Sequence, residues 1–249
     1  MEVNKIYNED CLLTMGRMPS MFVDLIITSP PYGGLREYNG YEYEFHETAK
    51  QMWRVIKMGG VLVWVIGDSV ENGSETGDPF RNVIFFMNLG FRLHDTMIYK
   101  KNSSSYPASK NSNRYTQIFE YMFVLSKGKP KTVNLICDKK NKWAGVASFD
   151  KKIPPVPDFS PRENIWEYVT SFNDPTNHPA VMPEALAKDH IYSWSNKGDL
   201  VYDPFMGSGT TAKMAHLQQR NWVGSEISKE YVELANKRLD PYLKQSQLF

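Results

Sequence analysis

Several features are scarce in this sequence of 249 residues, and each shortage excludes a class of protein. Two cysteines, Cys11 and Cys137, provide neither a disulfide framework nor a metal site, and they favour a reducing, cytoplasmic compartment. No apolar run reaches about 18 residues and no leader pattern is present, so we expect no membrane contact. The net charge is only +1, so the whole-chain charge does not indicate a nucleic-acid partner.

The common nucleotide-binding motifs are also missing, because neither G-x-G-x-x-G nor a Walker lysine occurs. A glycine turn is nevertheless present after a predicted strand that ends at Asp203. Gly207 and Gly209 allow a ligand to approach the backbone closely. Thr210 and Thr211 begin a predicted helix whose first amides can hold a carboxylate. This turn therefore indicates a site for a ligand other than a dinucleotide or a triphosphate.

Two further carboxylates stand at predicted strand ends. Glu226 follows the next strand, about 20 residues after the glycine turn, where an acid usually binds ribose hydroxyls. Asp10 lies between a short strand and a helix, and its position fits a helix N-cap as well as a ligand contact. A ligand that carries both a ribose and a carboxylate fits this set, and S-adenosylmethionine is such a ligand.

The most informative stretch is a strand that stops at two prolines. Residues 25–27 are three apolar residues typical of a buried parallel strand. Pro30 and Pro31 must end it, since proline has no N–H for the sheet. Ser29 and the carbonyl groups can accept hydrogen bonds from an amine, and Tyr32 offers a ring for stacking. We interpret this corner as a pocket for the exocyclic amine of an extruded base, although a plain turn with a packed tyrosine is the alternative.

Charge is unevenly distributed along the chain. Residues 96–152 contain twelve Lys/Arg and three Asp/Glu, a net charge of +9, which the rest of the chain offsets. This asymmetry favours a polyanionic partner at one place, and a solvated basic surface is the alternative. The candidate contacts to such a partner are Arg36, which precedes this segment, and Lys100, Lys101, Lys110, Arg114, Lys139, Lys140 and Lys142 within it.

Apolar periodicity predicts alternating strands and helices, and hence an α/β fold. We expect strands over 3–8, 61–66, 91–99, 118–125, 199–203 and 222–226, with 91–99 and 118–125 antiparallel neighbours. We expect helices over 11–18, 45–57, 80–89, 183–194 and 229–239, the last one stopped by Pro241. Residues 69–78 are predicted to be a polar loop. From 127 to about 164, prolines and lysines interrupt the pattern and indicate an inserted recognition region.

Two motifs together resemble one enzyme family. Residues 28–32, Thr-Ser-Pro-Pro-Tyr, resemble the catalytic motif of amino-type DNA methyltransferases, and residues 203–211 resemble their cofactor loop. The order of the two motifs is similar to that of the permuted β group. The resemblance implies a Rossmann-like class I sheet, mostly parallel with an antiparallel strand, with double-stranded DNA as substrate and S-adenosylmethionine as cofactor. It also implies a catalytic half at 1–126, a variable target-recognition region at 127–168 and a cofactor half at 169–249.

The resemblance also assigns roles to individual residues. The cofactor would be held by Asp10, Thr28, Asp203, Pro204, Phe205, Gly207, Ser208, Gly209, Thr210, Thr211 and Glu226. The flipped base would be held by Ser29, Pro30, Pro31 and Tyr32. A homodimer and a cognate restriction endonuclease are further expectations taken from the family, and no metal is expected.

In the family that this sequence resembles, the residue at position 29 correlates with the target base. Members with serine there are mostly cytosine-N4 enzymes, so the resemblance favours cytosine N4, and adenine N6 is the alternative. Carbon-5 methylation is excluded because neither Cys11 nor Cys137 stands where that chemistry needs its nucleophile. An RNA or small-molecule methyltransferase and a non-catalytic DNA-binding module stay open as competing functions.

Overall fold

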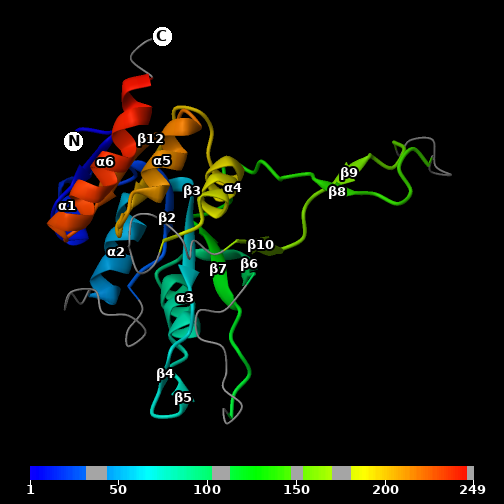
Figure 1. Cartoon of the computed structure of the whole chain (residues 1–249), viewed down its shortest axis with the longest axis horizontal. Coiled ribbons are helices and arrows are strands. Elements are labelled where there is room, and N and C mark those ends of the chain that lie inside the picture. Colours follow the sequence, from blue (N-terminus) through cyan, green and yellow to red (C-terminus); the bar gives the residue numbers. More distant parts are fainter. Residues whose placement is uncertain (32–43, 103–112, 147–153, 170–180, 246–249) are drawn as a thin grey trace.

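The centre of the molecule is one eight-stranded sheet with the strand order β1-β12-β11-β2-β3-β7-β6-β10 (Figure 1). A computed structural model describes residues 1–31, 44–102, 113–146, 154–169 and 181–245 of the chain. The sheet strands are β1 Lys5–Tyr7, β2 Val23–Thr28, β3 Ile56–Ile66, β6 Arg92–Lys101, β7 Phe119–Ser126, β10 Ile165–Tyr168, β11 Leu200–Asp203 and β12 Asn221–Ser225. Within this sheet β7 alone is antiparallel to its neighbours, so the expected mostly parallel fold is confirmed.

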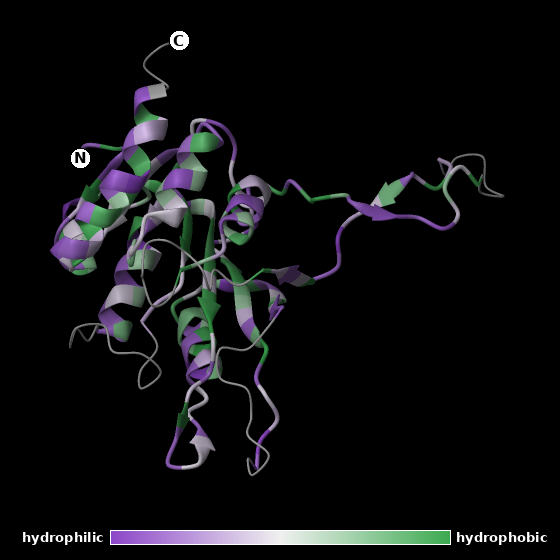
Figure 2. Ribbon diagram, viewed as in Figure 1, coloured by the Kyte–Doolittle hydropathy of each residue, from purple (hydrophilic) through white to green (hydrophobic). Residues whose placement is uncertain are grey.

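Helices cover both faces of the sheet. They are α1 Cys11–Arg17, α2 Phe45–Val55, α3 Asp78–Asn88, α4 Glu184–Trp194, α5 Thr210–Leu217 and α6 Lys229–Gln245. Helices α4, α5 and α6 contribute to one buried apolar cluster, and α1, α2 and α3 contribute to the other. In Figure 2 the central strands are mostly apolar, whereas polar residues lie on the outer helix faces.

The continuous apolar runs of the sequence follow from this two-sided burial. Leu25 and Ile27 of β2 pack into the cluster beneath α4, α5 and α6, whereas Ile26 packs on the opposite side. All three side chains are fully buried. Because successive side chains of a strand point to opposite faces, a strand covered on both sides must be apolar at every position.

Two predicted helix boundaries are wrong. The helix expected over 45–57 ends at Val55, because Ile56 is already part of β3 and pairs with Val23. The Lys127 ammonium donates to the carbonyl groups of Trp53 and Ile56 and satisfies the helix end. The last helix does not stop before Pro241 but continues to Gln245.

The continuation past proline is explained by the packing of the turn that follows it. Proline removes one N–H from a helix, and packing of the following turn can compensate for that loss. The ring of Tyr242 lies 4.8 Å from the Lys213 ammonium, and Leu243 packs against the core. The contacts of this turn therefore favour an intact helix.

The predicted polar loop 69–78 contains a small hairpin, β4 Val70–Glu71 and β5 Ser74–Glu75. The buried carboxylate of Asp68 organises this hairpin by accepting hydrogen bonds from the N–H groups of Ser69 and Gly77 and from the Thr76 hydroxyl.

The edge strand β10 was also not predicted. It lies within 127–168, so this stretch contributes to the main sheet, and the proposed domain limits stay a prediction.

A long arm projects from the sheet beyond α4 (Figure 1). We define the arm as the described residues 135–146 and 154–163. It contains the short hairpin β8 Lys139–Lys140 and β9 Phe159–Ser160. No helix in the described parts of the chain is long and apolar enough to cross a membrane.

Candidate active site

The proline corner and the glycine turn lie side by side although about 175 residues separate them. Strands β2 and β11 are parallel neighbours, with Val201 opposite Leu25. Their carboxyl ends therefore meet at one edge of the sheet. The Thr28 hydroxyl donates a 2.6 Å hydrogen bond to Oδ1 of Asp203. Ser29 follows immediately, so the two motifs share one site, at the edge where open α/β sheets bind their ligands.

Asp203 is the hub of this site. Its carboxylate is buried and also accepts hydrogen bonds from the Phe205 N–H at 3.0 Å and from the Thr211 hydroxyl at 2.6 Å. Burial raises the pKa of Asp203 to about 6, while the hydrogen bonds oppose the rise. One side chain thus connects the catalytic strand, the glycine turn and the start of α5.

Glu226 fixes the other side of the glycine turn. Its Oε2 accepts a 2.8 Å hydrogen bond from the N–H of Gly207, and its Oε1 accepts one from the N–H of Ser228. Burial raises the pKa of Glu226, and these backbone donors oppose the rise. Gly209 has φ = 82° and precedes α5, a conformation that favours glycine. The turn is therefore held by both the sheet and its own backbone conformation.

Asp10 lies at the carboxyl end of the neighbouring strand. Its carboxylate accepts a 2.6 Å hydrogen bond from the N–H of Leu12 and caps α1, so the N-cap interpretation is confirmed. The Asn8 amide donates to the carbonyl groups of Glu226 and Ile227 and joins this end of β1 to β12. A contact between Asp10 and a ligand stays a prediction.

These groups fit S-adenosylmethionine chemically. Carboxylates stand at the carboxyl ends of three adjacent strands, β1, β12 and β11, and can pair with an ammonium, ribose hydroxyls or an adenine amine. The first N–H groups of α5 have no partners within the helix and favour a ligand carboxylate. Within the described residues, no group of three or more His, Cys, Asp or Glu could hold a metal ion.

Three residues near the glycine turn were not predicted. The Arg238 guanidinium donates to the hydroxyls of Ser208 and Thr210, at 3.1 and 3.0 Å. It also pairs with Glu184, which accepts a second ion pair from Lys213 at 2.7 Å. The two hydroxyls expected to hold the cofactor thus hold the turn against α4 and α6. No local pattern could have indicated this, because the partners lie 28 to 54 residues apart.

Several candidate DNA contacts are paired with acids of the chain itself. Lys100 pairs with Glu167 and Lys101 with Glu120. On the arm, Lys139 pairs with Glu163. Their role in DNA binding stays a prediction.

The remaining candidates fall into two groups. Lys140 and Lys142 are exposed on the arm, and neither has an ion pair with another described residue. Arg114 donates to the carbonyl of Gly73 in the β4–β5 hairpin. Tyr32, Arg36 and Lys110 lie outside the described residues.

A mostly parallel sheet with one antiparallel strand, β7, and a ligand site at the carboxyl ends of its strands is the class I methyltransferase fold. The DNA methylase family matches residues 23–237 of this chain. M.BamHII, an orphan methyltransferase of Bacillus amyloliquefaciens, is 52% identical over 241 residues, which cover 89% of this chain and 90% of that protein. The chain therefore belongs to the DNA methylase family that modifies cytosine N4 or adenine N6, and it is an S-adenosylmethionine-dependent DNA methyltransferase.

Solved structures agree with this assignment. The complex of M1.HpyAVI with S-adenosylmethionine aligns with a TM-score of 0.66 and 25% identity, and covers 94% of this chain and 99% of that chain. The cytosine-N4-specific PvuII DNA methyltransferase aligns with a TM-score of 0.71 and covers 96% of this chain and 91% of that one. Its identity is 22%, so this likeness concerns the fold alone.

Proposed function

We propose that this DNA methyltransferase transfers its methyl group to the N4 amine of a cytosine that has been flipped out of duplex DNA. The observation that carries the proposal is the 2.6 Å bond between Thr28 and Asp203, because it sets Ser29 beside the cofactor turn. The serine at position 29 supports cytosine through the motif resemblance. Extrusion of the base costs a few kcal/mol, which stacking and phosphate contacts can offset.

The proline corner supplies hydrogen-bond acceptors at the end of β2. The amine of cytosine is a poor nucleophile because its lone pair is conjugated with the ring. Acceptance of its N–H bonds by the Ser29 hydroxyl and the Pro30 carbonyl favours a more pyramidal, more nucleophilic nitrogen. S-adenosylmethionine, when bound, supplies the electrophilic methyl group. Positioning of the two reactants can contribute about 7–11 kcal/mol.

The remaining residues of the site hold the two ends of the cofactor. In this proposal Asp203 and the start of α5 face the methionine end, Glu226 faces the ribose and Asp10 faces the adenine. The buried Asp203 must be ionised to hold an ammonium, and its pKa lies at about 6. Cofactor affinity should therefore fall as the pH drops below that value.

Methylation of adenine N6 is the second candidate, because the family contains both activities and the acceptor geometry suits either amine. The test is mass spectrometry of nucleosides from PCR-amplified chromosomal DNA incubated with the protein and S-adenosylmethionine. N4-methylcytosine is expected. N6-methyladenine alone would refute the choice of base, and labelled methyl in RNA but not in DNA would refute the substrate class.

Partners other than DNA stay proposals. A homodimer and a cognate restriction endonuclease are family expectations. Light scattering of the purified protein tests the first, and cleavage of unmethylated DNA by a host extract that carries the gene and its neighbours tests the second.

A further inference from the structure

The arm has little structure of its own to fix its direction. Its hairpin pairs only Lys139 with Ser160 and Lys140 with Phe159. Further out, single backbone bonds run from Asn141 N–H to the Asp158 carbonyl, from Gly145 N–H to the Val156 carbonyl and from Val156 N–H to the Val146 carbonyl, and none of them extends the ladder. A two-stranded ribbon is marginally stable in water unless it packs on another element. The direction in which the arm projects must therefore be set where it leaves the sheet.

Arg162 joins the two strands of the arm at that point. Its N–H donates to the carbonyl of Ile136, and its Nε donates to the carboxylate of Asp138 at 2.9 Å. Both partners lie on the opposite strand of the arm. The guanidinium also lies 5.1 Å from the ring of Trp166, a buried side chain of β10. These contacts place one arginine between the arm and the sheet edge.

The same guanidinium attaches the arm to α4. Its Nη1 donates to Asp189 at 2.8 Å and to the Tyr168 hydroxyl at 3.2 Å, and that hydroxyl donates to Asp189 at 2.7 Å. The Asp189 side chain is 19% exposed, so water screens this ion pair less than it screens a surface pair. Asn134, just before the arm, donates to the carbonyl groups of Tyr192 and Ser195 at the end of α4.

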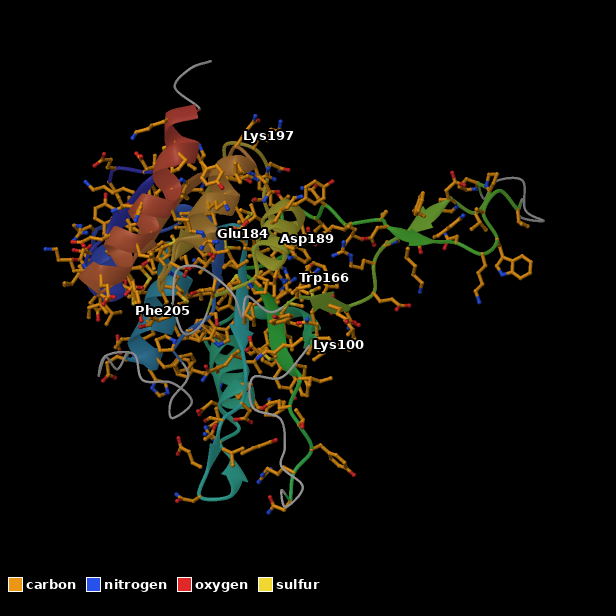
Figure 3. The ribbon with its side chains drawn as sticks, viewed as in Figure 1. Lys100, Trp166, Glu184, Asp189, Lys197 and Phe205 are labelled. Atoms are coloured by element: carbon orange, nitrogen blue, oxygen red, sulfur yellow. The ribbon has the colours of Figure 1, made fainter. Side chains whose placement is uncertain are left out.

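Helix α4 thus contacts the arm through Asp189 and its C-terminal end, and it contacts the cofactor turn through Glu184 at its N-terminal end. Glu184 and Asp189 both project from this helix (Figure 3). Glu184 pairs with Arg238, whose guanidinium donates to Ser208 and Thr210 of the turn. An eleven-residue helix with both attachments can fix the arm relative to the reacting groups.

We infer that the Arg162–Asp189 ion pair is a positioning contact that holds the arm, with its exposed Lys140 and Lys142, in the direction that a DNA duplex requires. This inference rests on the proposed function, since it assumes that the arm contacts DNA. Neither residue needs to touch the substrate. A preorganised arm lowers the cost of ordering it upon binding, so loosening it should weaken DNA binding and leave cofactor binding intact.

The test compares two variants with the same change of charge. Asp189→Asn removes the charge of the attachment but keeps an oxygen for Tyr168. Glu163→Gln removes an acid on the arm whose side chain is 71% exposed and whose one ion pair among the described residues is with Lys139, also on the arm. Each variant makes the protein more positive by one, which by itself should favour DNA binding.

We expect Asp189→Asn to raise the KM for PCR-amplified chromosomal DNA by roughly tenfold, with kcat and the Kd of S-adenosylmethionine close to wild type. Hydrogen exchange of the arm amides should become faster. Glu163→Gln should leave KM unchanged or lower it. Equal KM values and equal arm exchange in the two variants would overturn the inference.

Asp138→Asn provides a second route if Asp189→Asn folds poorly. It releases Arg162 from the arm side at a half-exposed residue and leaves α4 untouched. We expect a higher KM and faster arm exchange here as well, and wild-type values would contradict the inference. Absence of methyl transfer to any DNA by the wild type would instead refute the proposed function, whereas the exchange comparison would still test the attachment.

Discussion

At the carboxyl edge of the sheet, Asp203 and Glu226 are enclosed by the chain, and each accepts hydrogen bonds from two or more donors. On the arm, Lys140 and Lys142 are exposed and the ribbon around them has few contacts of its own. The first region is determined by many interactions among strands, turn and helices. The second depends on Arg162 and Asn134 at its base.

The difference corresponds to what each region must do. A site that aligns two reactants loses rate with small displacements, so its groups need several supports. A surface that reads a duplex must instead reach outward and present charge and aromatic rings to solvent. Trp143 on the arm is such an aromatic ring, with 72% of its surface exposed to solvent. Each prediction below changes one side of this comparison.

Ser29→Ala should give the largest effect. The substitution removes one acceptor at the end of β2 and leaves Thr28 and Asp203 in place. We expect kcat to fall on the order of 100-fold, as for loss of one polar group that acts in the transition state. Calorimetry should show wild-type affinity for S-adenosylmethionine. Ser74→Ala in the exposed β5 is the matched control, and unchanged turnover of Ser29→Ala would contradict the role of the serine.

Gly209→Ala should break the support of the cofactor turn. Gly209 has φ = 82°, and an added Cβ would lie 2.9 Å from Cβ of Ala235. We expect a loss of about 2–3 kcal/mol in the free energy of unfolding, from strain and overpacking together, and weaker cofactor binding.

Gly73→Ala separates the two causes. Gly73 also has a positive φ, of 78°, but an added Cβ would meet no atom within 4 Å. Gly73→Ala should therefore lower the free energy of unfolding only through the strained backbone conformation, by about 1 kcal/mol. Equal losses in thermal unfolding would show that the close approach to Ala235 contributes nothing.

The enclosed region was also the more predictable one. The three apolar residues of β2, the prolines after them and the glycine turn at 207–209 are local patterns with local causes. Once both strands were predicted to be parallel and buried, their carboxyl ends had to lie at the same edge. The antiparallel pairing of β6 and β7 was likewise predicted, and it is confirmed by the register of Thr96 opposite Phe123.

What the sequence did not indicate depends on distant partners. Strand β10 has only four residues with alternating exposure, and its place is set by β6, more than sixty residues earlier. The contacts of Arg162 with Asp189 and of Arg238 with Ser208 join elements that are brought together only by the tertiary fold. Pro241 has a local pattern that favours a helix end, but the contacts of Tyr242 outweigh it.

His190 tests the helix that lies between the two regions. It is fully buried in α4, 4.7 Å from the ring of Trp166, and burial lowers its pKa to about 3. The folded protein disfavours the protonated form of His190. The free energy of unfolding therefore carries no penalty from this residue above the unfolded pKa of 6.5. It should fall by up to about 1.4 kcal/mol per pH unit as the pH drops toward 3.

His190→Gln removes this titration while a side-chain acceptor remains for the Trp194 indole N–H. In urea unfolding between pH 6 and 4, the difference between wild type and variant should shrink as the pH falls. Asp203, whose pKa is raised, contributes in the opposite direction but is present in both proteins, so it cancels. His94→Gln, at an exposed histidine, is the control. If the stability of His190→Gln changed with pH in parallel with that of the wild type, burial of His190 would not be the cause.

The smallest effect concerns a single arm lysine. If Lys142 contacts a phosphate, Lys142→Gln should lower the slope of log K against log salt by about 0.9, and affinity by a few-fold near 0.1 M salt. Lys229→Gln is the control, because that side chain is 82% exposed and its helix, α6, lies on the opposite side of the molecule from the arm (Figure 1). Fluorescence anisotropy with PCR-amplified duplex measures both slopes. Equal slopes for the two variants would mean that the DNA does not contact Lys142 of the arm. A smaller slope for Lys142→Gln alone would show that the two regions differ in function as well as in construction, with the arm binding the phosphates and the enclosed site aligning the reactants.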